Sequence, residues 1–412
     1  MVSLKQKCAQ PRRLKVVYFM DKPHEIDGSA QIMLGYASRL WQINCQPTVV
    51  FIHPFSKDNQ YFYQLRQRGI SVFSLTHSYM FYVIRCARVL RNILNLAVPK
   101  IGFITWDDTI ELFLSYYFKW KKTDIVHVFR SDKGMPLAIK AGYRANIPVL
   151  YHEMGIPRFK ENDDLHFQKL AKVLPLCASV AGLSQTLSLM LADCVPTNIN
   201  SYVIPLIWEN AAGFERQMSN ERGVVHIGFV GRLEKLKGAV DLIEAFFLAK
   251  ENLHCPAKLI LAGDGPELES LKLRAKELGC GDLIEIRQPY LGEKEKEEYY
   301  RNIDILVLPS YSEGTPNCII EAMSFGIPVI AYPVGGVPDV IPKDIGFLVD
   351  TGDICELASA IAKLVNNKRQ RQQLGIRSRE HVKMVFSGSR VLPILREIYE
   401  RILSVNNDPA AN

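Results

Sequence analysis

The sequence predicts an α/β protein made of two doubly wound domains, each built on a parallel sheet. Short apolar runs rich in β-branched residues alternate with segments of helical period almost from end to end. The chain has 412 residues, and single hydrophobic cores stop growing at about 250 to 300 residues, so two domains are expected. A polar segment near the middle, ENAAGFERQMSNERG, interrupts the alternation and is the best candidate for a linker.

The expected strands divide into two sets on either side of this linker, with helical segments between them. In the first half they are Leu14–Phe19, Thr48–His53, Ser71–Leu75, Ile125–Phe129, Val149–His152, Ser179–Gly182 and Tyr202–Pro205. In the second half they are Val224–Val230, Lys258–Ala262, Leu283–Arg287, Ile305–Leu308 and Val329–Tyr332. We therefore expect domains at residues 1–210 and 211–387. Residues 388–412 carry an apolar helical stripe that could pack on either domain, including back on the first.

Composition and charge narrow the class of protein. Apolar residues make up 48% of the chain and charged residues 23%, which excludes disorder, collagen and coiled coils. No apolar run reaches the length of a membrane span and the start has no signal-peptide pattern, so we expect a cytoplasmic protein. The nine cysteines never occur in a Cys-x-x-Cys spacing, so neither a disulfide framework nor a zinc site is expected.

The net charge of +7 is unevenly distributed along the chain. Residues 1–210 hold 25 Lys and Arg against 15 Asp and Glu, a balance of +10, while residues 211–412 hold 25 against 28, a balance of −3. The basic half is therefore expected to meet an anionic substrate or surface. Its cations include Lys5, Lys7, Arg12, Arg13 and Lys15 at the start and a row at Arg85, Arg88 and Arg91 within an amphipathic segment. Burial of that segment in the domain is the alternative to contact with an anionic membrane.

The stretch PSYSEGTPNCIIEAMSFGIPVIAYPVGG, residues 309–336, carries the clearest chemistry. A buried strand ends at Pro309, and a helix is expected to begin near Thr315 with Pro316 in its first turn. The free N–H groups of such a helix start form an anion site. Glu313 and Glu321 beside it suit sugar hydroxyls, which donate hydrogen bonds to carboxylates. Ligands of parallel sheets bind where strands end, so this site is expected in a cleft between the domains.

A second stretch, GFVGRLEKLKG at residues 228–238, has the same strand, loop, helix form. Arg232 and Lys237 follow the strand, where two cations converging on a cleft would neutralise a diphosphate. Gly231 and Gly238 allow the backbone to bend and to approach a ligand closely.

Together these stretches resemble the retaining nucleotide-sugar glycosyltransferases of family four, which have the glycosyltransferase B fold of two Rossmann-like domains facing a central cleft. The match consists of Gly-Arg-Leu-x-x-x-Lys-Gly, Gly-Asp-Gly-Pro at 263–266, the Ser-Glu-Gly loop, two glutamates separated by seven residues, and the Gly-Gly turn ending at Asp339. It covers residues 224–386 closely and the first half loosely. The chain departs from the family pattern at residues 204–209, and at Gln288 in place of a glycine.

The resemblance implies roles for individual residues. Arg232 and Lys237 would bind the donor diphosphate, Glu321 the ribose hydroxyls and Glu313 the transferred sugar. In the first half, His152 would lie near the transferred sugar, while the mid-strand His127 is expected to be structural. The remaining donor-binding residues that the resemblance implies are Gly28, in a loop that faces the phosphates, Gly231, Gly314, Thr315 and Asn317.

We therefore expect an enzyme that moves a sugar, with retention, from a UDP- or GDP-sugar to a glycan or lipid-linked acceptor in polysaccharide or glycolipid synthesis. The chain has no Asp-x-Asp metal motif, so no metal, no other cofactor and no nucleic acid partner is expected. A nucleotide-sugar epimerase and a non-catalytic partner subunit are the alternatives. A dehydrogenase is disfavoured, because Gly263-x-Gly265 lacks the third glycine, Leu268 standing in its place.

Overall fold

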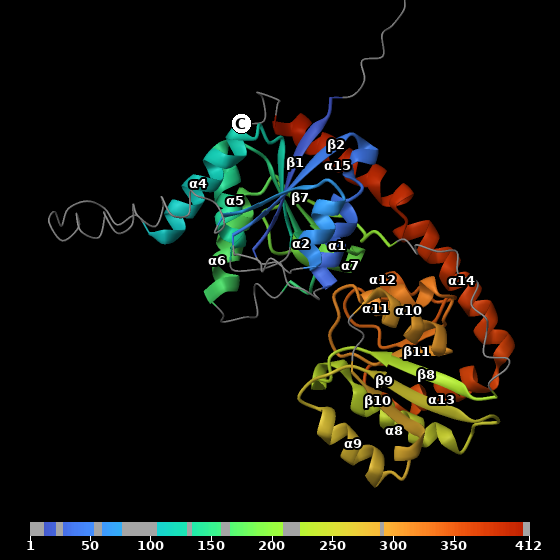
Figure 1. Cartoon of the computed structure of the whole chain (residues 1–412). Helices are drawn as coiled ribbons and strands as arrows, with labels where there is room; N and C mark the ends of the chain where they lie inside the picture. The colour runs from blue at the N-terminus through green and yellow to red at the C-terminus, as the bar shows by residue number, and fades with distance from the viewer. Residues whose placement is uncertain are drawn as a thin grey trace, which may run out of the picture.

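The computed structural model describes residues 12–21, 28–52, 60–75, 105–129, 134–157, 165–208, 223–288 and 292–406. These ranges form two parallel sheets with helices on their faces (Figure 1). Within them, the first sheet has seven strands in the order β3-β2-β1-β4-β5-β6-β7, and the second has six in the order β10-β9-β8-β11-β12-β13. The predicted fold class, two doubly wound domains, is confirmed.

The first domain contains the N-terminal elements. Its strands are β1 (Leu14–Met20), β2 (Cys45–Phe51), β3 (Ser71–Ser74), β4 (Ile125–Phe129), β5 (Val149–Glu153), β6 (Ser179–Gly182) and β7 (Asn200–Val203). Its helices are α1 (Gly28–Ala37), α2 (Gln60–Gln67), α4 (Trp106–Trp120), α5 (Met135–Ala145), α6 (Leu165–Val173) and α7 (Gln185–Ala192).

The second domain and the C-terminal helices follow. The strands are β8 (Val225–Val230), β9 (Ala257–Ala262), β10 (Ile284–Arg287), β11 (Ile305–Leu308), β12 (Val329–Ala331) and β13 (Phe347–Leu348). The helices are α8 (Ala239–Lys250), α9 (Leu268–Glu277), α10 (Glu293–Asn302), α11 (Asn317–Ser324), α12 (Val337–Val340), α13 (Ile354–Asn366), α14 (Lys368–Phe386) and α15 (Gly388–Asn406).

The central strands explain why these sequences form parallel sheets. β1 and β4 are almost completely buried and consist mainly of apolar residues, as strands covered on both faces do. In each sheet the strand order reverses once, between β1 and β4 and between β8 and β11. Connections at such a point leave in opposite directions and open a crevice at the carboxyl ends of the strands.

The sequence located the strands well. Each predicted strand is present with its ends shifted by at most a few residues, whereas the two-residue β13 was missed because it is too short to show alternation. The predicted linker, the cations Lys5 and Lys7 and the arginine row at 85, 88 and 91 lie outside the described residues. Within the described part, no helix combines the length and apolar character needed to cross a membrane.

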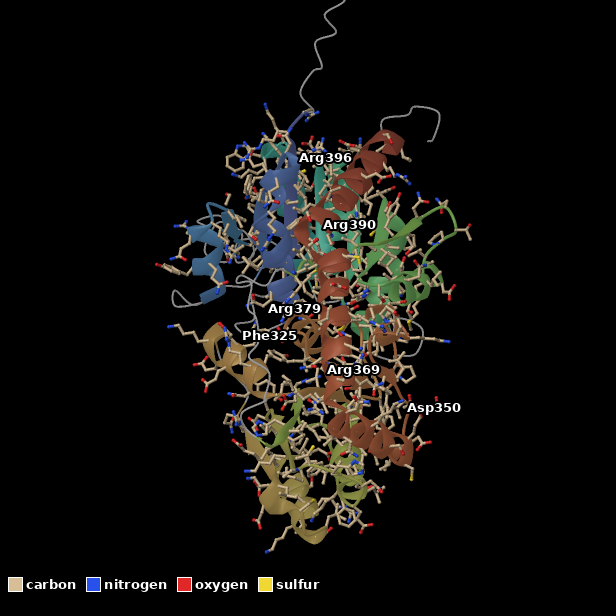
Figure 2. The ribbon with its side chains drawn as sticks, turned by 90° about the vertical axis from the view of Figure 1, so that its right-hand side faces the viewer. Phe325, Asp350, Arg369, Arg379, Arg390 and Arg396 are labelled. Carbon is tan, nitrogen blue, oxygen red and sulfur yellow. The ribbon has the colours of Figure 1, made fainter. Side chains whose placement is uncertain are left out.

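The last two helices connect the domains. α14 packs on α11 and α13 of the second domain, and α15 then runs along the first domain (Figure 1, Figure 2). The Arg396 guanidinium donates to the carbonyl of Ile43 at 3.2 Å. Trp208 N–H, at the end of the first domain, donates to the Phe386 carbonyl at 2.7 Å, where α14 ends. Residues 388–406 therefore pack on the first domain.

A buried polar network holds α15 against the first sheet. The Tyr399 hydroxyl donates to the Tyr18 hydroxyl at 3.2 Å and lies 2.8 Å from His127 Nδ1. His127 Nε2 lies 3.3 Å from His152 Nδ1, and both imidazoles are fully buried. Burial lowers the pKa of His152 to about 3 and holds that of His127 well below its ordinary value. Both rings are therefore neutral at physiological pH.

Removal of the Tyr399 hydroxyl should destabilise the protein. Tyr399→Phe keeps the packing but deprives His127 Nδ1 and the Tyr18 hydroxyl of a buried partner, at a cost of about 1 to 3 kcal/mol. Urea unfolding of the full chain measures this cost. Tyr63, which is 63% exposed, provides the matched control, and Tyr63→Phe should change the unfolding free energy by less than about 0.5 kcal/mol. Equal effects of the two substitutions would contradict the network.

The two buried histidines should also make stability depend on pH. Their folded pKa values are depressed, whereas in the unfolded chain they return to about 6.5. The unfolded state then binds more protons below that pH, so the unfolding free energy should fall on going from about pH 7 to about pH 5, by up to about 1.4 kcal/mol per unit for each histidine. His152→Asn should flatten this dependence, and an unchanged slope would mean that the ring titrates normally in the folded protein.

Candidate functional site

Two loops meet where the second sheet reverses its order. Lys237 follows β8 and Glu313 follows β11, and the Lys237 Nζ lies 2.6 Å from Glu313 Oε1. Both side chains are largely buried, with exposed fractions of 18% and 10%. The convergence of a cation with a carboxylate at this point, which sequence spacing alone could not show, places a charged site at the carboxyl ends of β8 and β11.

Gly238 makes this close approach possible. Its φ is +66°, in the left-handed region that favours glycine, and a Cβ there would lie 1.9 Å from the Pro309 carbonyl oxygen. The Tyr311 N–H donates to the Leu236 carbonyl at 2.8 Å and joins the two loops directly. Any larger residue at 238 would push apart the loops that bear Lys237 and Glu313.

Asp241, in the first turn of α8, ties the segments that follow β11 and β12 to this helix by side-chain hydrogen bonds. Its Oδ2 accepts from the Tyr311 hydroxyl at 2.7 Å and from the Tyr332 hydroxyl at 2.9 Å. The hydrogen bond to Asp241 raises the pKa of Tyr311, and burial together with Asp241 raises that of Tyr332. Both hydroxyls therefore stay protonated and can donate. No short-range pattern indicates this cluster, because its members are distant along the chain.

Beside the ion pair, α11 begins at Asn317, two residues later than the sequence indicated, with Pro316 as its N-cap in an extended conformation. The Pro316 side chain has no atom that could accept a capping hydrogen bond, so the N–H groups of the helix start stay available. Among the described residues, two buried polar atoms here lack a hydrogen-bond partner, Thr315 Oγ1 and Asn317 Oδ1. Unsatisfied buried polar atoms at a helix start are consistent with a ligand-binding position.

Glu321 is positioned from the neighbouring helix. Its Oε2 accepts from the Tyr300 hydroxyl at 2.7 Å, and its Oε1 lies 3.5 Å from Lys296 Nζ. The side chain is 8% exposed, so its carboxylate is fixed by α10. Sequence analysis missed Lys296 and Tyr300, because α10 has the charged pattern of a solvated surface helix.

The first domain faces this site through the loop after β5. A Cβ on Gly314 would lie 2.8 Å from the Met154 carbonyl and 3.0 Å from Gly155 Cα. Thr186 N–H of the first domain also donates to Asp339 Oδ2 of the second at 2.9 Å. The Glu313 loop and the end of β5 are therefore in contact, and the site lies between the domains.

Glu153 shapes the loop that touches Gly314. Its Oε1 accepts from the N–H groups of Met154 and Gly155 at 2.9 and 3.0 Å, and its Oε2 accepts from the Tyr151 hydroxyl at 2.5 Å. The residue is 2% exposed. A carboxylate at the last position of an apolar strand is the signal that could have identified it.

The other candidates occupy less central positions. Arg232 is 72% exposed on its side chain and pairs with Glu234 at 2.7 Å. Gly231 N–H donates to the Ala262 carbonyl at 3.1 Å at the end of β8, and Gly28 is the first residue of α1. His152 is fully buried beneath the cleft end of β5. The described residues contain no cluster of three or more His, Cys, Asp or Glu side chains that could hold a metal ion.

Comparison with known proteins identifies the second half. Residues 215–381 match the family model described as glycosyl transferases group 1. N-acetyl-alpha-D-glucosaminyl L-malate synthase from Bacillus anthracis is 32% identical over 186 residues, which are 45% of this chain and 46% of that protein. The capsular polysaccharide biosynthesis glycosyltransferase CapM from Staphylococcus aureus is 30% identical over 182 residues, 43% of this chain and 46% of CapM. The chain thus matches less than half the length of these curated relatives.

Solved structures extend the likeness to the whole chain at the level of the fold. Anabaena HepE in complex with UDP has a TM-score of 0.73 at 16% identity, covering 94% of this chain and all of that one. Sucrose-phosphate synthase from Thermosynechococcus elongatus has a TM-score of 0.68 at 18% identity, covering 95% of this chain and all of that one. Residues 215–381 therefore match the glycosyl transferases group 1 model, within a chain that has the two-domain glycosyltransferase B fold.

Proposed function

We propose that the protein transfers a sugar from a nucleotide diphosphate sugar to a glycan or lipid-linked acceptor, with retention of configuration and without a metal ion. The observation that carries the proposal is the Lys237–Glu313 pair at 2.6 Å, held beside the start of α11 and against the first domain. The groups at this crevice match two parts of such a donor. The cation and the helix N–H groups suit the diphosphate, which carries the leaving-group charge, and the carboxylate suits the sugar hydroxyls.

The leaving diphosphate would be stabilised by protein groups alone. Lys237 would turn from Glu313 toward the phosphate, and the N–H groups at the start of α11, with the Thr315 hydroxyl as a further donor, would complete the anion site. Arg232 is exposed enough to swing from Glu234 to the same phosphate. Charge stabilisation of this kind replaces the role of a metal ion in other transferases.

Retention would follow from attack on the same face that the diphosphate leaves. The bond between the anomeric carbon and the phosphate oxygen breaks as the acceptor oxygen bonds to that carbon, through an oxocarbenium-like state. The departing phosphate oxygen takes the acceptor proton, so no protein nucleophile is required. Glu313 would accept hydrogen bonds from the sugar hydroxyls, and Glu321, fixed by Tyr300, would accept from the ribose. His152 would lie near the transferred sugar and support the end of β5. Gly28, the first residue of α1, would face the donor phosphates.

The acceptor would bind to the basic first domain. Relatives of the second domain are named for capsular polysaccharide and teichuronic acid biosynthesis, and neighbouring folds were solved with UDP or UDP-glucose. These names support a nucleotide-sugar donor and a role in cell-surface polysaccharide synthesis. The donor base, UDP or GDP, the glycolipid acceptor and the cytoplasmic location are our proposals. Incubation with labelled donors tests the proposal. Transfer or slow hydrolysis supports it, an isomerised donor indicates an epimerase, and no turnover with any donor indicates a non-catalytic subunit.

Removal of either proposed diphosphate cation should slow transfer. Lys237→Ala or Arg232→Ala should lower the rate by roughly 100-fold or more, by analogy with loss of one transition-state donor. Lys235, an exposed lysine of the same loop, provides the matched control, and Lys235→Ala should transfer at a near-normal rate. Addition of EDTA should leave the wild-type rate unchanged. Folded Lys237 and Arg232 variants with normal rates, or a strict metal requirement, would contradict the assignment.

The two glutamates should separate by ligand. Glu321→Gln should weaken binding of the bare nucleoside diphosphate and of the sugar donor alike, because ribose is common to both. Glu313→Gln should mainly weaken the sugar donor. A thermal-shift screen of UDP, GDP and ADP first identifies the base, since a ligand at 100 times its Kd stabilises the protein by about 2.7 kcal/mol. Calorimetric titration of each variant with the bare nucleotide and with the sugar donor then measures the difference in affinity. Equal losses of bare nucleotide affinity in both variants would refute the division.

A further inference from the structure

Helix α4 is apolar on two opposite faces. Its inner face packs into the core of the first domain through Ile110, Leu114, Tyr117 and Phe118, all at most 6% exposed. Its outer face carries Leu112, Tyr116 and Trp120, which are 46%, 72% and 72% exposed. The spacing of four residues aligns these three side chains in one row, which we call the α4 stripe. Large apolar side chains that are exposed together in one row are a feature of interaction surfaces, so the stripe is a candidate docking surface.

Cations surround the Trp120 end of the stripe. Lys119, Lys121 and Lys122 lie within three positions of Trp120, and the Lys121 ammonium is 4.5 Å from the Trp120 ring centroid. The start of β1 adds further cations, because Arg12 pairs with Asp124 at 2.6 Å and the Lys15 N–H donates to the same carboxylate at 2.8 Å. The six members of this basic cluster are Arg12, Arg13, Lys15, Lys119, Lys121 and Lys122.

The neighbouring acids leave the basic cluster with a net positive charge. Asp124 neutralises one of the six cations, Arg12, and also accepts from the backbone of β1. The exposed acids of α4, Asp107 and Asp108, lie in its first turn, three turns away from Trp120. Asp108 is further engaged in the capping box with Thr105. The helix therefore presents aromatic rings and positive charge together at its C-terminal end.

We propose that the α4 stripe and the basic cluster form a docking surface for an anionic lipid bilayer. Tyr and Trp are the residues that concentrate at the level of lipid headgroups, with the ring in the apolar boundary and the polar tip in water. Lysine and arginine at the same level are attracted by anionic headgroups. A second copy of the chain fits less well, because a stable protein interface buries about 800 Å² per partner over some 20 to 30 residues, whereas the stripe has three apolar side chains.

The position of the surface is compatible with activity. α4 lies on the outer side of the first domain, away from the second domain (Figure 1). Docking there leaves the Lys237–Glu313 site unobstructed. This inference goes beyond the proposed function and does not depend on it, since lipid binding is measured without donor.

Vesicle co-sedimentation of the full chain tests the proposal. Binding to vesicles of equal parts phosphatidylcholine and phosphatidylglycerol should exceed binding to pure phosphatidylcholine by at least about tenfold and should weaken as salt increases. The double variant Tyr116→Ser, Trp120→Ser should lose roughly tenfold or more of this affinity, and the triple variant Lys119→Gln, Lys121→Gln, Lys122→Gln should lose both affinity and salt dependence.

Matched controls come from exposed residues elsewhere. Tyr63→Ser with Ile376→Ser removes side chains of similar exposure, 63% and 61%, and Lys258→Gln, Lys276→Gln, Lys383→Gln removes three exposed lysines of the second half. Neither control should alter vesicle binding, and all variants should keep the wild-type thermal shift with nucleotide if they are folded. Equal binding of wild type to neutral and anionic vesicles would overturn the proposal, as would a wild-type dimer in gel filtration that the Tyr116, Trp120 variant converts to monomer.

Discussion

The Lys237–Glu313 ion pair joins the two loops on which the second domain's site is built. β8 and β11 are neighbours in the sheet, so the loops that follow them leave from adjacent positions. The pair is mostly buried, and a buried charge that loses its partner costs several kcal/mol. Each loop is therefore held in place by the charge of the other. The absence of a Cβ at Gly238 is the steric condition for this arrangement.

The chain passes between the two domains twice, once after Trp208 and once between α14 and α15. The hydrogen bond from the Trp208 N–H to the Phe386 carbonyl joins these two places and holds the first domain against the site. α15 is then anchored by the buried hydroxyl of Tyr399. Because α15 follows the second domain in sequence but packs on the first, this helix limits the angle between the domains. The contact of Gly314 with Met154 and Gly155 depends on this placement.

The sequence predicted those features that short-range patterns encode. Apolar runs located the strands, and loops after two of them contained Lys237, Glu313 and the start of α11, because ligand sites in parallel sheets follow strand ends. Contacts between distant segments could not be predicted in this way. Asp241 reaches Tyr311 and Tyr332 across 70 and 91 positions. The pairing of Arg232 with Glu234 is local, but it depends on side-chain conformations that the sequence does not specify. His152 matched a motif, but burial by Tyr36 and His127 emerges only from the packed domain.

A chain of contacts connects the end of the first domain to the proposed ribose carboxylate. The Trp208 ring lies 5.0 Å from the Lys296 ammonium, and that ammonium lies 3.5 Å from Glu321 Oε1. A partly desolvated cation over an indole contributes about 0.5 to 2 kcal/mol. Rotation of the domains that separates Trp208 from Lys296 would lose this contribution and change the charge environment of Glu321. A ligand can shift the domain angle only by its difference in affinity between the two arrangements. If Glu321 holds the ribose as proposed above, this contact would couple nucleotide binding to the domain angle by about 0.5 to 2 kcal/mol.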